Sequence, residues 1–126
     1  RSNLSALADV AERGHVRLLL LTQPSLWRPD LSPEEQKLLW LGGLGTFQEK
    51  PGAVYFTPGA LADAMARFNA VTLEVCRERH LDCLDLAERI PRRTDNFYDD
   101  CHFTDQGSDL VAREVSAWLG GLLTKP

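Results

Sequence analysis

The stretch "HVRLLLLTQP", residues 15–24, decides the fold of this chain. Its apolar residues follow one another without polar alternation until Pro24 ends the run. An unbroken apolar run of this kind is typical of a strand in a parallel sheet whose two faces are both covered. Helically spaced apolar residues at 3–13, followed by Gly14, predict a helix directly before it. A helix leading into such a strand predicts an α/β protein.

The sequence after residue 56 continues the alternation of helix and strand. Thr57 and the proline after it are favourable at the start of a helix, which we expect over 58–79. The stretch "LDCLDL" at 81–86 predicts a second short strand, followed by a turn of helix. The apolar stripe of the long helix comprises Leu61, Met65, Phe68, Thr72 and Val75.

A last helix is predicted at the carboxyl end of the sequence. Thr104 is expected to cap it, and it should run over about 105–119, where Gly120-Gly121 would end it. The residues expected to face inward are Leu110, Val111, Val115, Trp118 and Leu119.

The segment between the first strand and the long helix is less regular. Ser32 is a good helix cap followed by proline, and predicts a short helix toward Trp40. The glycine-rich stretch over 41–56 predicts a long loop, with a third strand as an option near Val54–Phe56.

Two predicted strands are few for a sheet this apolar. A typical sheet has about four to six strands, and the predicted strands need neighbours to cover them. We therefore expect residues 1–126 to be the C-terminal portion of a single α/β domain whose N-terminal strands lie outside this chain.

Composition excludes some classes of partner. The net charge is −4 and the basic residues are scattered, which argues against a nucleic-acid or anionic-membrane surface. The longest apolar run is far shorter than the roughly 18 residues that a membrane span needs. The three cysteines, Cys76, Cys83 and Cys101, form no CxxC motif, so the sequence determines neither a disulfide pairing nor a compartment.

The stretch "DNFYDDCHFTDQG", residues 95–107, carries the strongest chemical signal. Asp99 and His102 are three residues apart in a predicted turn before a helix, so the carboxylate can accept the imidazole Nδ1–H. The Nε2 atom is then free to take a proton from a nucleophile. Asp100 is the substitute for Asp99 in this interpretation. A turn without chemistry is the alternative, because Asp and His are common before helices.

The nearby cysteine and the other histidines are weaker candidates for a nucleophile or a metal ligand. Cys101 adjoins His102, and neighbouring side chains in an extended turn are expected to diverge, so an inert, partly buried thiol is the favoured interpretation. A zinc site from Cys101, His102, Asp99 and His80 would need a convergence that the spacing does not indicate. His80, at a helix end, and His15 are interpreted as structural.

Aromatic residues lie in two places, within the irregular segment before the long helix and on either side of the Asp99–His102 motif. Each set has two interpretations, the lining of an acyl pocket or ordinary packing. The two sets are Trp27, Trp40 and Phe47, and Phe97, Tyr98 and Phe103.

Several stretches resemble the SGNH/GDSL hydrolases. "FYDDCHFTDQGSDLVAREVSAWL" is similar to the C-terminal signature of that family, an Asp-x-x-His before a capped helix with an early glycine. "NLSALADVAERGHVRLLLLTQP" resembles its helix, glycine and apolar strand, and "YFTPGALADAMARFNAVTLEVCRERHLDCLDLAERIP" its long helix and following strand. The resemblance covers nearly the whole chain, least at 25–52.

The resemblance implies a fold and an activity. The family fold is a three-layer α/β/α sandwich, flavodoxin-like, with a parallel sheet. The implied activity is ester hydrolysis through an acyl-enzyme, on lipid, short-chain or acetylated-carbohydrate esters. His102 would be the general base and Asp99 its orienting carboxylate, with no metal or cofactor.

The family's nucleophile has no counterpart in this sequence. The family serine lies in a Gly-Asp-Ser motif, and its oxyanion donors include a glycine and an asparagine; none of these motifs occurs here. We therefore expect the serine on a complementary N-terminal segment or chain. The alternative is a non-catalytic ligand-binding or interaction module that retains the fold.

Overall fold

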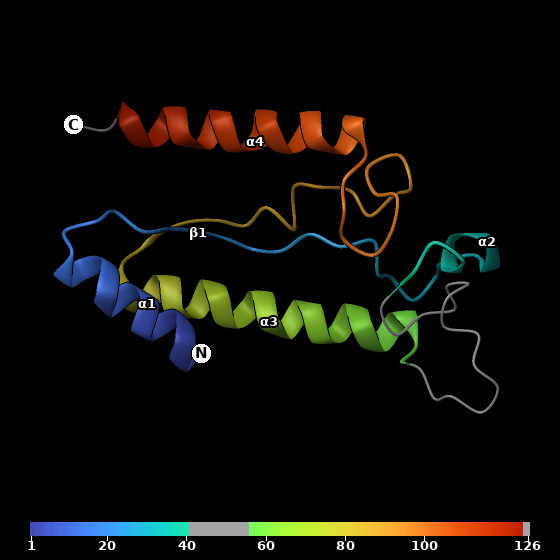
Figure 1. Cartoon of the computed structure of the whole chain (residues 1–126), viewed down its shortest axis with the longest axis horizontal. Coiled ribbons are helices and arrows are strands. Elements are labelled where there is room, and N and C mark those ends of the chain that lie inside the picture. Colours follow the sequence, from blue (N-terminus) through green and yellow to red (C-terminus); the bar gives the residue numbers. More distant parts are fainter. Residues whose placement is uncertain (41–55, 125–126) are drawn as a thin grey trace.

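The computed structural model describes residues 1–40 and 56–124. Helices and strands alternate along them, as Figure 1 shows. The elements are α1 (Ser2–Arg13), β1 (Leu19–Leu21), α2 (Pro33–Gln36), α3 (Pro58–Arg79), β2 (Asp82–Leu84) and α4 (Asp105–Leu123). Among these residues, no helix combines the length and the apolar character that crossing a membrane requires.

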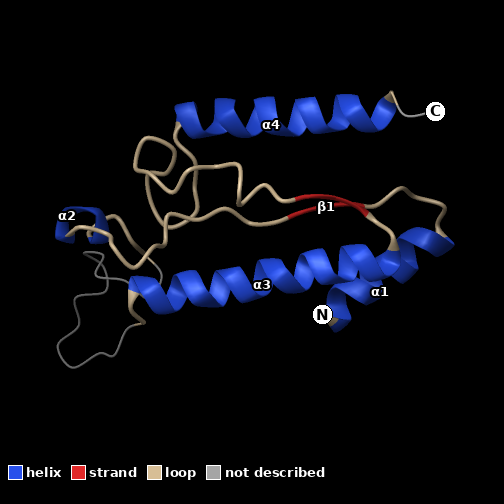
Figure 2. Ribbon diagram, turned by 180° about the vertical axis from the view of Figure 1, so that it is seen from behind, coloured by secondary structure: helices blue, strands red, loops and turns tan. Residues whose placement is uncertain are grey.

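The sheet pairs β1 with β2 in parallel, and the general α/β class is confirmed. Leu19 is opposite Asp82, Leu20 opposite Cys83, and Leu21 opposite Leu84. Parallel neighbours need a long crossover between them, and α3 supplies it here. Figure 2 shows the two short strands beside each other between the helices.

Helices lie on both sides of the strand pair. In Figure 1, α4 lies on one side, and α3 with α1 lies on the other. The apolar core is built largely from the segments that follow the strands and contains Leu26, Trp27, Leu31, Leu39, Ala62, Leu84, Leu86, Ile90 and Phe97. The predicted inner face of α4 packs against this core, partly buried, through Leu110, Val111, Val115 and Trp118.

The first strand is shorter and more exposed than the sequence predicts. β1 covers three residues of the 15–24 stretch, and Leu21 is 39% exposed while its register partner Leu84 is 2% exposed. Val16, just before the strand, is 65% exposed. The prediction of burial on both faces is therefore wrong for the described residues, which leave part of one face of β1 exposed.

The observed first residues of the helices agree with the predicted ones better than the observed last residues do. Ser32 caps α2 in a reciprocal capping box with Glu35, as the serine–proline pair predicted. However, α2 ends at Gln36 and does not reach Trp40. α4 continues through Gly120 and Gly121 to Leu123, so the predicted end at Gly120-Gly121 is wrong.

Left-handed backbone occurs at two histidines instead of at the predicted stop glycine. His15 has φ 52° and His80 has φ 53°, while Gly14 has φ −84°. His80 is the C-cap of α3, where its backbone N–H donates to the carbonyl of Cys76. Its structural role at the helix end is as predicted, whereas His15 forms a turn and does not open a strand.

Two further predictions concern the turn after the second strand and the loop before the long helix. The turn of helix expected after 81–86 is a single hydrogen-bonded turn at residues 87–89, in which the N–H of Ile90 donates to the carbonyl of Leu86 over 3.2 Å, and it does not extend into a helix. The long loop and the optional third strand lie almost entirely within 41–55, outside the described residues. Phe56, the last residue of that strand option, is exposed and not in a strand.

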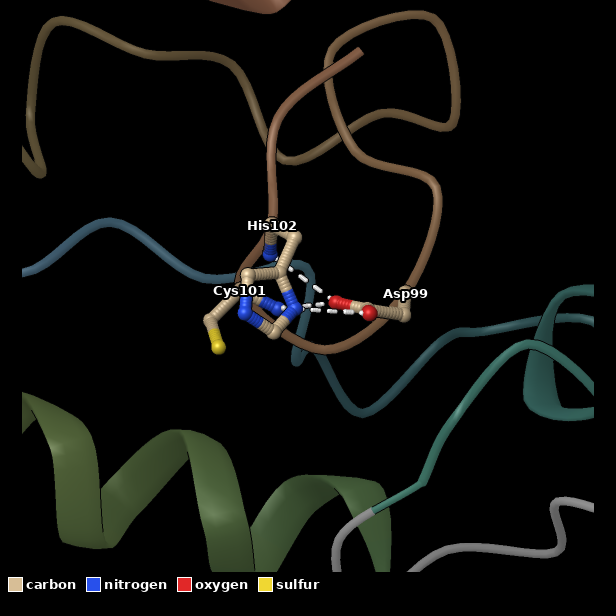
Figure 3. Close-up of side chains that lie close together, drawn as sticks. All are labelled: Asp99, Cys101 and His102. Atoms are coloured by element: carbon tan, nitrogen blue, oxygen red, sulfur yellow. Dashed lines mark hydrogen bonds and ion pairs between the residues drawn. The ribbon is translucent and has the colours of Figure 1, made fainter.

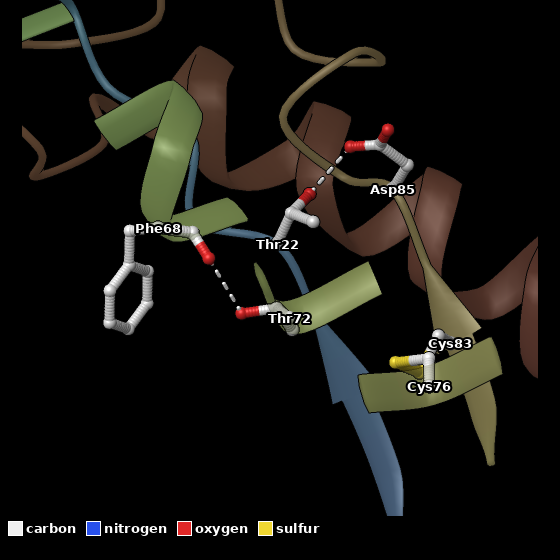
Figure 4. The surroundings of a disulfide bond; sticks show 6 residues. All are labelled: Thr22, Phe68, Thr72, Cys76, Cys83 and Asp85. Carbon is white, nitrogen blue, oxygen red and sulfur yellow. Dashed lines mark hydrogen bonds between the residues drawn. A yellow bond between two sulfur atoms is a disulfide. The ribbon is translucent and has the colours of Figure 1, made fainter. Parts of the chain in front are cut away.

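A disulfide bond joins Cys76 near the end of α3 to Cys83 in β2 (Figure 4). The two Cα atoms are 6.2 Å apart, across the left-handed turn at His80. The bond fixes the end of the crossover helix against the strand that it leads into. Cys101 remains a free thiol.

Candidate active site

The candidate site lies beyond the carboxyl ends of the two strands. Thr22 follows β1 and Asp85 follows β2, and the Thr22 hydroxyl donates to Asp85 Oδ1 over 2.7 Å (Figure 4). The same hydroxyl accepts from the backbone N–H of Ala87 over 2.9 Å. These bonds fix the start of the segment that leads to residues 95–104. In parallel sheets, ligand sites form at this edge.

Residues 97–103 form a closed loop directly before α4 (Figure 1). Phe97 and Phe103 form an antiparallel bridge, and their ring centroids are 5.1 Å apart. Phe97 is fully buried, so the loop is anchored in the core. The N–H of Thr104 donates to the carbonyl of Asn96 over 3.0 Å and closes the base of the loop. These two aromatic residues therefore pack against each other and against the core.

Gly107 permits the first turn of α4 to lie against the base of this loop. A Cβ atom at Gly107 would lie 2.1 Å from the carbonyl oxygen of Asn96, far closer than atoms can approach. The N–H of Gly107 donates to the Thr104 hydroxyl over 3.1 Å, which is the predicted helix cap. The early glycine thus has a steric function that fixes the loop to the helix.

Asp99 and His102 form the predicted pair (Figure 3). Asp99 Oδ2 lies 2.8 Å from His102 Nδ1, and Oδ1 accepts from the backbone N–H groups of His102 and Cys101 over 2.9 and 3.0 Å. The side chain of Asp99 is 2% exposed, and that of His102 is 62% exposed. A buried carboxylate therefore orients an imidazole that is open to solvent.

The pKa of Asp99 is lowered in this environment. Burial raises it, but hydrogen bonds from the backbone N–H groups of Cys101 and His102, and from the His102 ring, outweigh burial. The carboxyl is therefore ionised at neutral pH and accepts the Nδ1–H of His102. In the neutral ring this leaves Nε2 as the proton acceptor.

Tyr98 lies against the ring of His102. The two ring centroids are 5.7 Å apart and the ring planes differ by 12°, so the rings are stacked. Tyr98 is itself 54% exposed. The stack restrains the imidazole orientation from a second direction without covering the site.

Asp100 has a different role from Asp99. Its Oδ1 accepts from the indole N–H of Trp27 over 2.7 Å, and its Oδ2 accepts from the backbone N–H of Trp40. Its backbone carbonyl accepts from the N–H of Leu26 over 2.9 Å. Asp100 thus ties the 26–40 segment to the histidine loop, and the geometry favours Asp99 as the partner of His102.

Cys101 lies closer to the pair than its sequence position predicts. One ligand atom from each of Asp99, Cys101 and His102 lies within 4.8 Å of the others, so the expected divergence of neighbouring side chains is wrong. His80 does not join this group. Burial raises the pKa of the Cys101 thiol, and the negative charges of Asp99 and Asp100 raise it further. The thiol is therefore a poor nucleophile at neutral pH.

The His102 ring has no hydroxyl hydrogen-bonded to it in the part of the chain that the structure describes. No serine or threonine of residues 1–40 and 56–124 donates a hydrogen bond to its ring. Ser32 caps α2 and Ser108 lies within α4, as predicted. Asn69 bonds the backbone of Gln23 through both side-chain atoms, a structural role.

The aromatic residues of the irregular segment divide between core and surface. Trp27 is 7% exposed and belongs to the core, whereas Trp40 is 56% exposed. Phe47 lies outside the described residues. The anchoring role of Asp100 has no signal in the sequence, because its partner Trp27 lies 73 residues away.

Comparison with known proteins identifies no family for this chain. No family model, curated protein or solved structure matches this chain.

Proposed function

We propose that this chain carries the histidine and aspartate of a serine esterase of the SGNH/GDSL type. The observation that carries the proposal is the pair itself, a solvent-open His102 ring 2.8 Å from a buried, ionised Asp99. A pair of this kind holds the imidazole in one tautomer and stabilises the imidazolium that forms when it takes a proton.

The proposed reaction transfers an acyl group in two steps. A serine hydroxyl attacks the ester carbonyl while His102 Nε2 accepts its proton, and the same proton passes to the leaving alcohol. Water then attacks the acyl-serine, and His102 again accepts and returns the proton. Asp99 stays ionised throughout and keeps Nδ1 as the donor. The substrate class is an ester of a lipid, a carbohydrate or a small alcohol.

The serine belongs, in this proposal, to a complementary N-terminal segment or partner chain. The proposed complete fold is the flavodoxin-like three-layer sandwich, with further parallel strands beside β1. The open edge of β1 supports that arrangement, because among the described residues β1 pairs with β2 alone and a further parallel strand could bond its other edge. The serine would then follow one of the added strands and reach the same carboxyl edge as His102.

The test uses hydrolysis of p-nitrophenyl acetate. The 126 residues alone should not exceed the background rate, whereas the full native gene product in which they occur should hydrolyse the ester. His102→Ala should abolish that turnover while the circular dichroism spectrum stays unchanged. Asp99→Asn should lower kcat by several orders of magnitude, because the ring loses its tautomer and orientation.

Asp100→Asn is the matched control for the Asp99 substitution. Asp100 is an equally buried carboxylate one residue away, but its side chain bonds Trp27 and Trp40 instead of His102. Its loss should change stability more than kcat. Equal losses of kcat in the Asp99 and Asp100 variants would refute the orienting role of Asp99.

A non-catalytic module that retains the fold is the alternative. In residues 1–40 and 56–124 no serine or threonine hydroxyl donates a hydrogen bond to the His102 ring, which favours this alternative. Unchanged background hydrolysis in the full gene product, with the protein folded, would support this alternative and exclude the esterase.

A further inference from the structure

Three side chains of different ligand chemistry meet at the tip of the histidine loop. Cys101 offers a sulfur atom, His102 a ring nitrogen and Asp99 a carboxylate oxygen, all within 4.8 Å of one another. Figure 3 shows the Cys101 sulfur beside the His102 ring, with the Asp99 carboxylate directed at the same ring. We propose that these three groups form a binding site for a thiophilic divalent cation of the zinc type.

The choice of cation follows from the ligands. Sulfur, imidazole and carboxylate are the donors that zinc takes in proteins. Calcium and magnesium need about six oxygen ligands and do not use thiolate. The set of one sulfur, one nitrogen and one oxygen therefore selects a soft or borderline ion, with water as a fourth ligand.

The site can form only if the imidazole leaves its bond to Asp99 Oδ2, so that a ring nitrogen and the carboxylate bind the ion in place of each other. Ligands of tetrahedral zinc, at 2.0–2.3 Å from the ion, lie roughly 3.5 Å from one another. The widest separation here, up to 4.8 Å, must therefore shorten by about 1 Å. The His102 side chain is 62% exposed and Cys101 is half-buried, so there is space for both to move, and the ring exchanges its bond to Asp99 for a bond to the ion. Asp99 is the fixed member, because two backbone N–H groups hold its Oδ1.

Charge at the site also favours a cation. The hydrogen-bond donors to Asp99 are N–H groups of Cys101 and His102, not a lysine or an arginine. Among residues 1–40 and 56–124, no lysine or arginine side chain bonds this carboxylate to cancel its negative charge. A bound divalent ion would compensate that charge and the thiolate together, and would displace the thiol proton.

The site does not depend on the proposed esterase reaction, but it bears on it. An ion bound to the imidazole competes with the proton that a general base must accept. Binding is measured directly, so its failure and the failure of the esterase proposal are separate results.

The experiment is a titration of the chain with Cd²⁺ and Zn²⁺, without a thiol reductant so that the disulfide stays formed. Cd²⁺ should give the ultraviolet thiolate-to-metal absorption band with one equivalent, and calorimetry should give one site for Zn²⁺. Cys101→Ser should abolish the band, and His102→Ala and Asp99→Asn should each weaken binding by about tenfold or more.

Two variants serve as matched controls. Cys76→Ser/Cys83→Ser removes the other two cysteine sulfur atoms and should keep the band. His80→Asn removes a histidine outside the cluster, in a left-handed conformation that asparagine tolerates, and should bind like the unchanged chain. A band that persists in Cys101→Ser, or no binding at millimolar Cd²⁺ and Zn²⁺, would overturn the proposal.

Discussion

Replacing Gly107 by alanine tests whether the loop that carries His102 depends on close contact with α4. The added Cβ atom would lie 2.1 Å from the carbonyl oxygen of Asn96 and 2.9 Å from its carbonyl carbon. These are backbone atoms, so no side-chain rotation relieves the contact. The chain must move by about 1 Å, and overpacking of this severity costs about 3 kcal/mol.

The opposing effect of helix propensity is smaller. Alanine is more favourable than glycine within a helix by about 1 kcal/mol. The net expectation for Gly107→Ala is therefore a loss of about 2 kcal/mol in the free energy of unfolding. For a chain of this length that corresponds to a fall of about 7 °C in Tm. Urea unfolding and a thermal melt measure both quantities.

Gly120 and Gly121 provide the controls within the same helix. A Cβ atom at either position meets nothing within 4 Å, so alanine there should raise stability by about 0.5–1 kcal/mol. Amide exchange of Thr104 should quicken in Gly107→Ala, because its N–H bonds the displaced Asn96 carbonyl. If Gly107→Ala is as stable as the two controls, the steric reasoning is refuted.

Three further predictions concern stability. Asp100→Ala should lower the free energy of unfolding by about 2–3 kcal/mol, because the buried indole N–H of Trp27 loses its charged acceptor; a change below the error of urea unfolding would contradict this. Replacing Cys76 and Cys83 together by serine should cost about 2.5 kcal/mol, from the short loop of separation 7 that the disulfide closes, with reduction of the unchanged chain as the comparison. The lowered pKa of Asp99 means that its ionised carboxyl stabilises the fold above its unfolded-state pKa of about 3.9, and that this stabilisation is lost as the pH falls through the lower folded value. Asp99→Asn should therefore flatten the dependence of stability on pH below about pH 4, and an unchanged acid profile would argue against it.

The histidine–aspartate pair was predictable from the sequence because all its contacts are local. Asp99 accepts from the backbone of residues two and three positions later, and its side chain meets the ring of the same His102. A spacing of three in a turn before a helix is sufficient to bring these groups together. The choice of Asp99 over Asp100 followed from the same local geometry and agrees with the structure.

The proximity of Cys101 to His102 was not predictable in this way. Adjacent side chains diverge in an extended chain, but the loop is closed by the Phe97–Phe103 bridge and is not extended. The bridge depends in turn on the burial of Phe97 in a core assembled from distant segments. No local pattern in the sequence predicts that the loop is closed.

The sequence by itself determined the helix starts, the alternation of helix and strand, and the Asp99–His102 pair, because caps, periodicity and short turns depend on neighbours within a few residues. Only the tertiary structure decided the disulfide between Cys76 and Cys83, the exposure of β1, and the bond from Asp100 to Trp27 across 73 residues. These features depend on which distant segments pack together. Packing is a property of the whole chain, and no single stretch of residues specifies it.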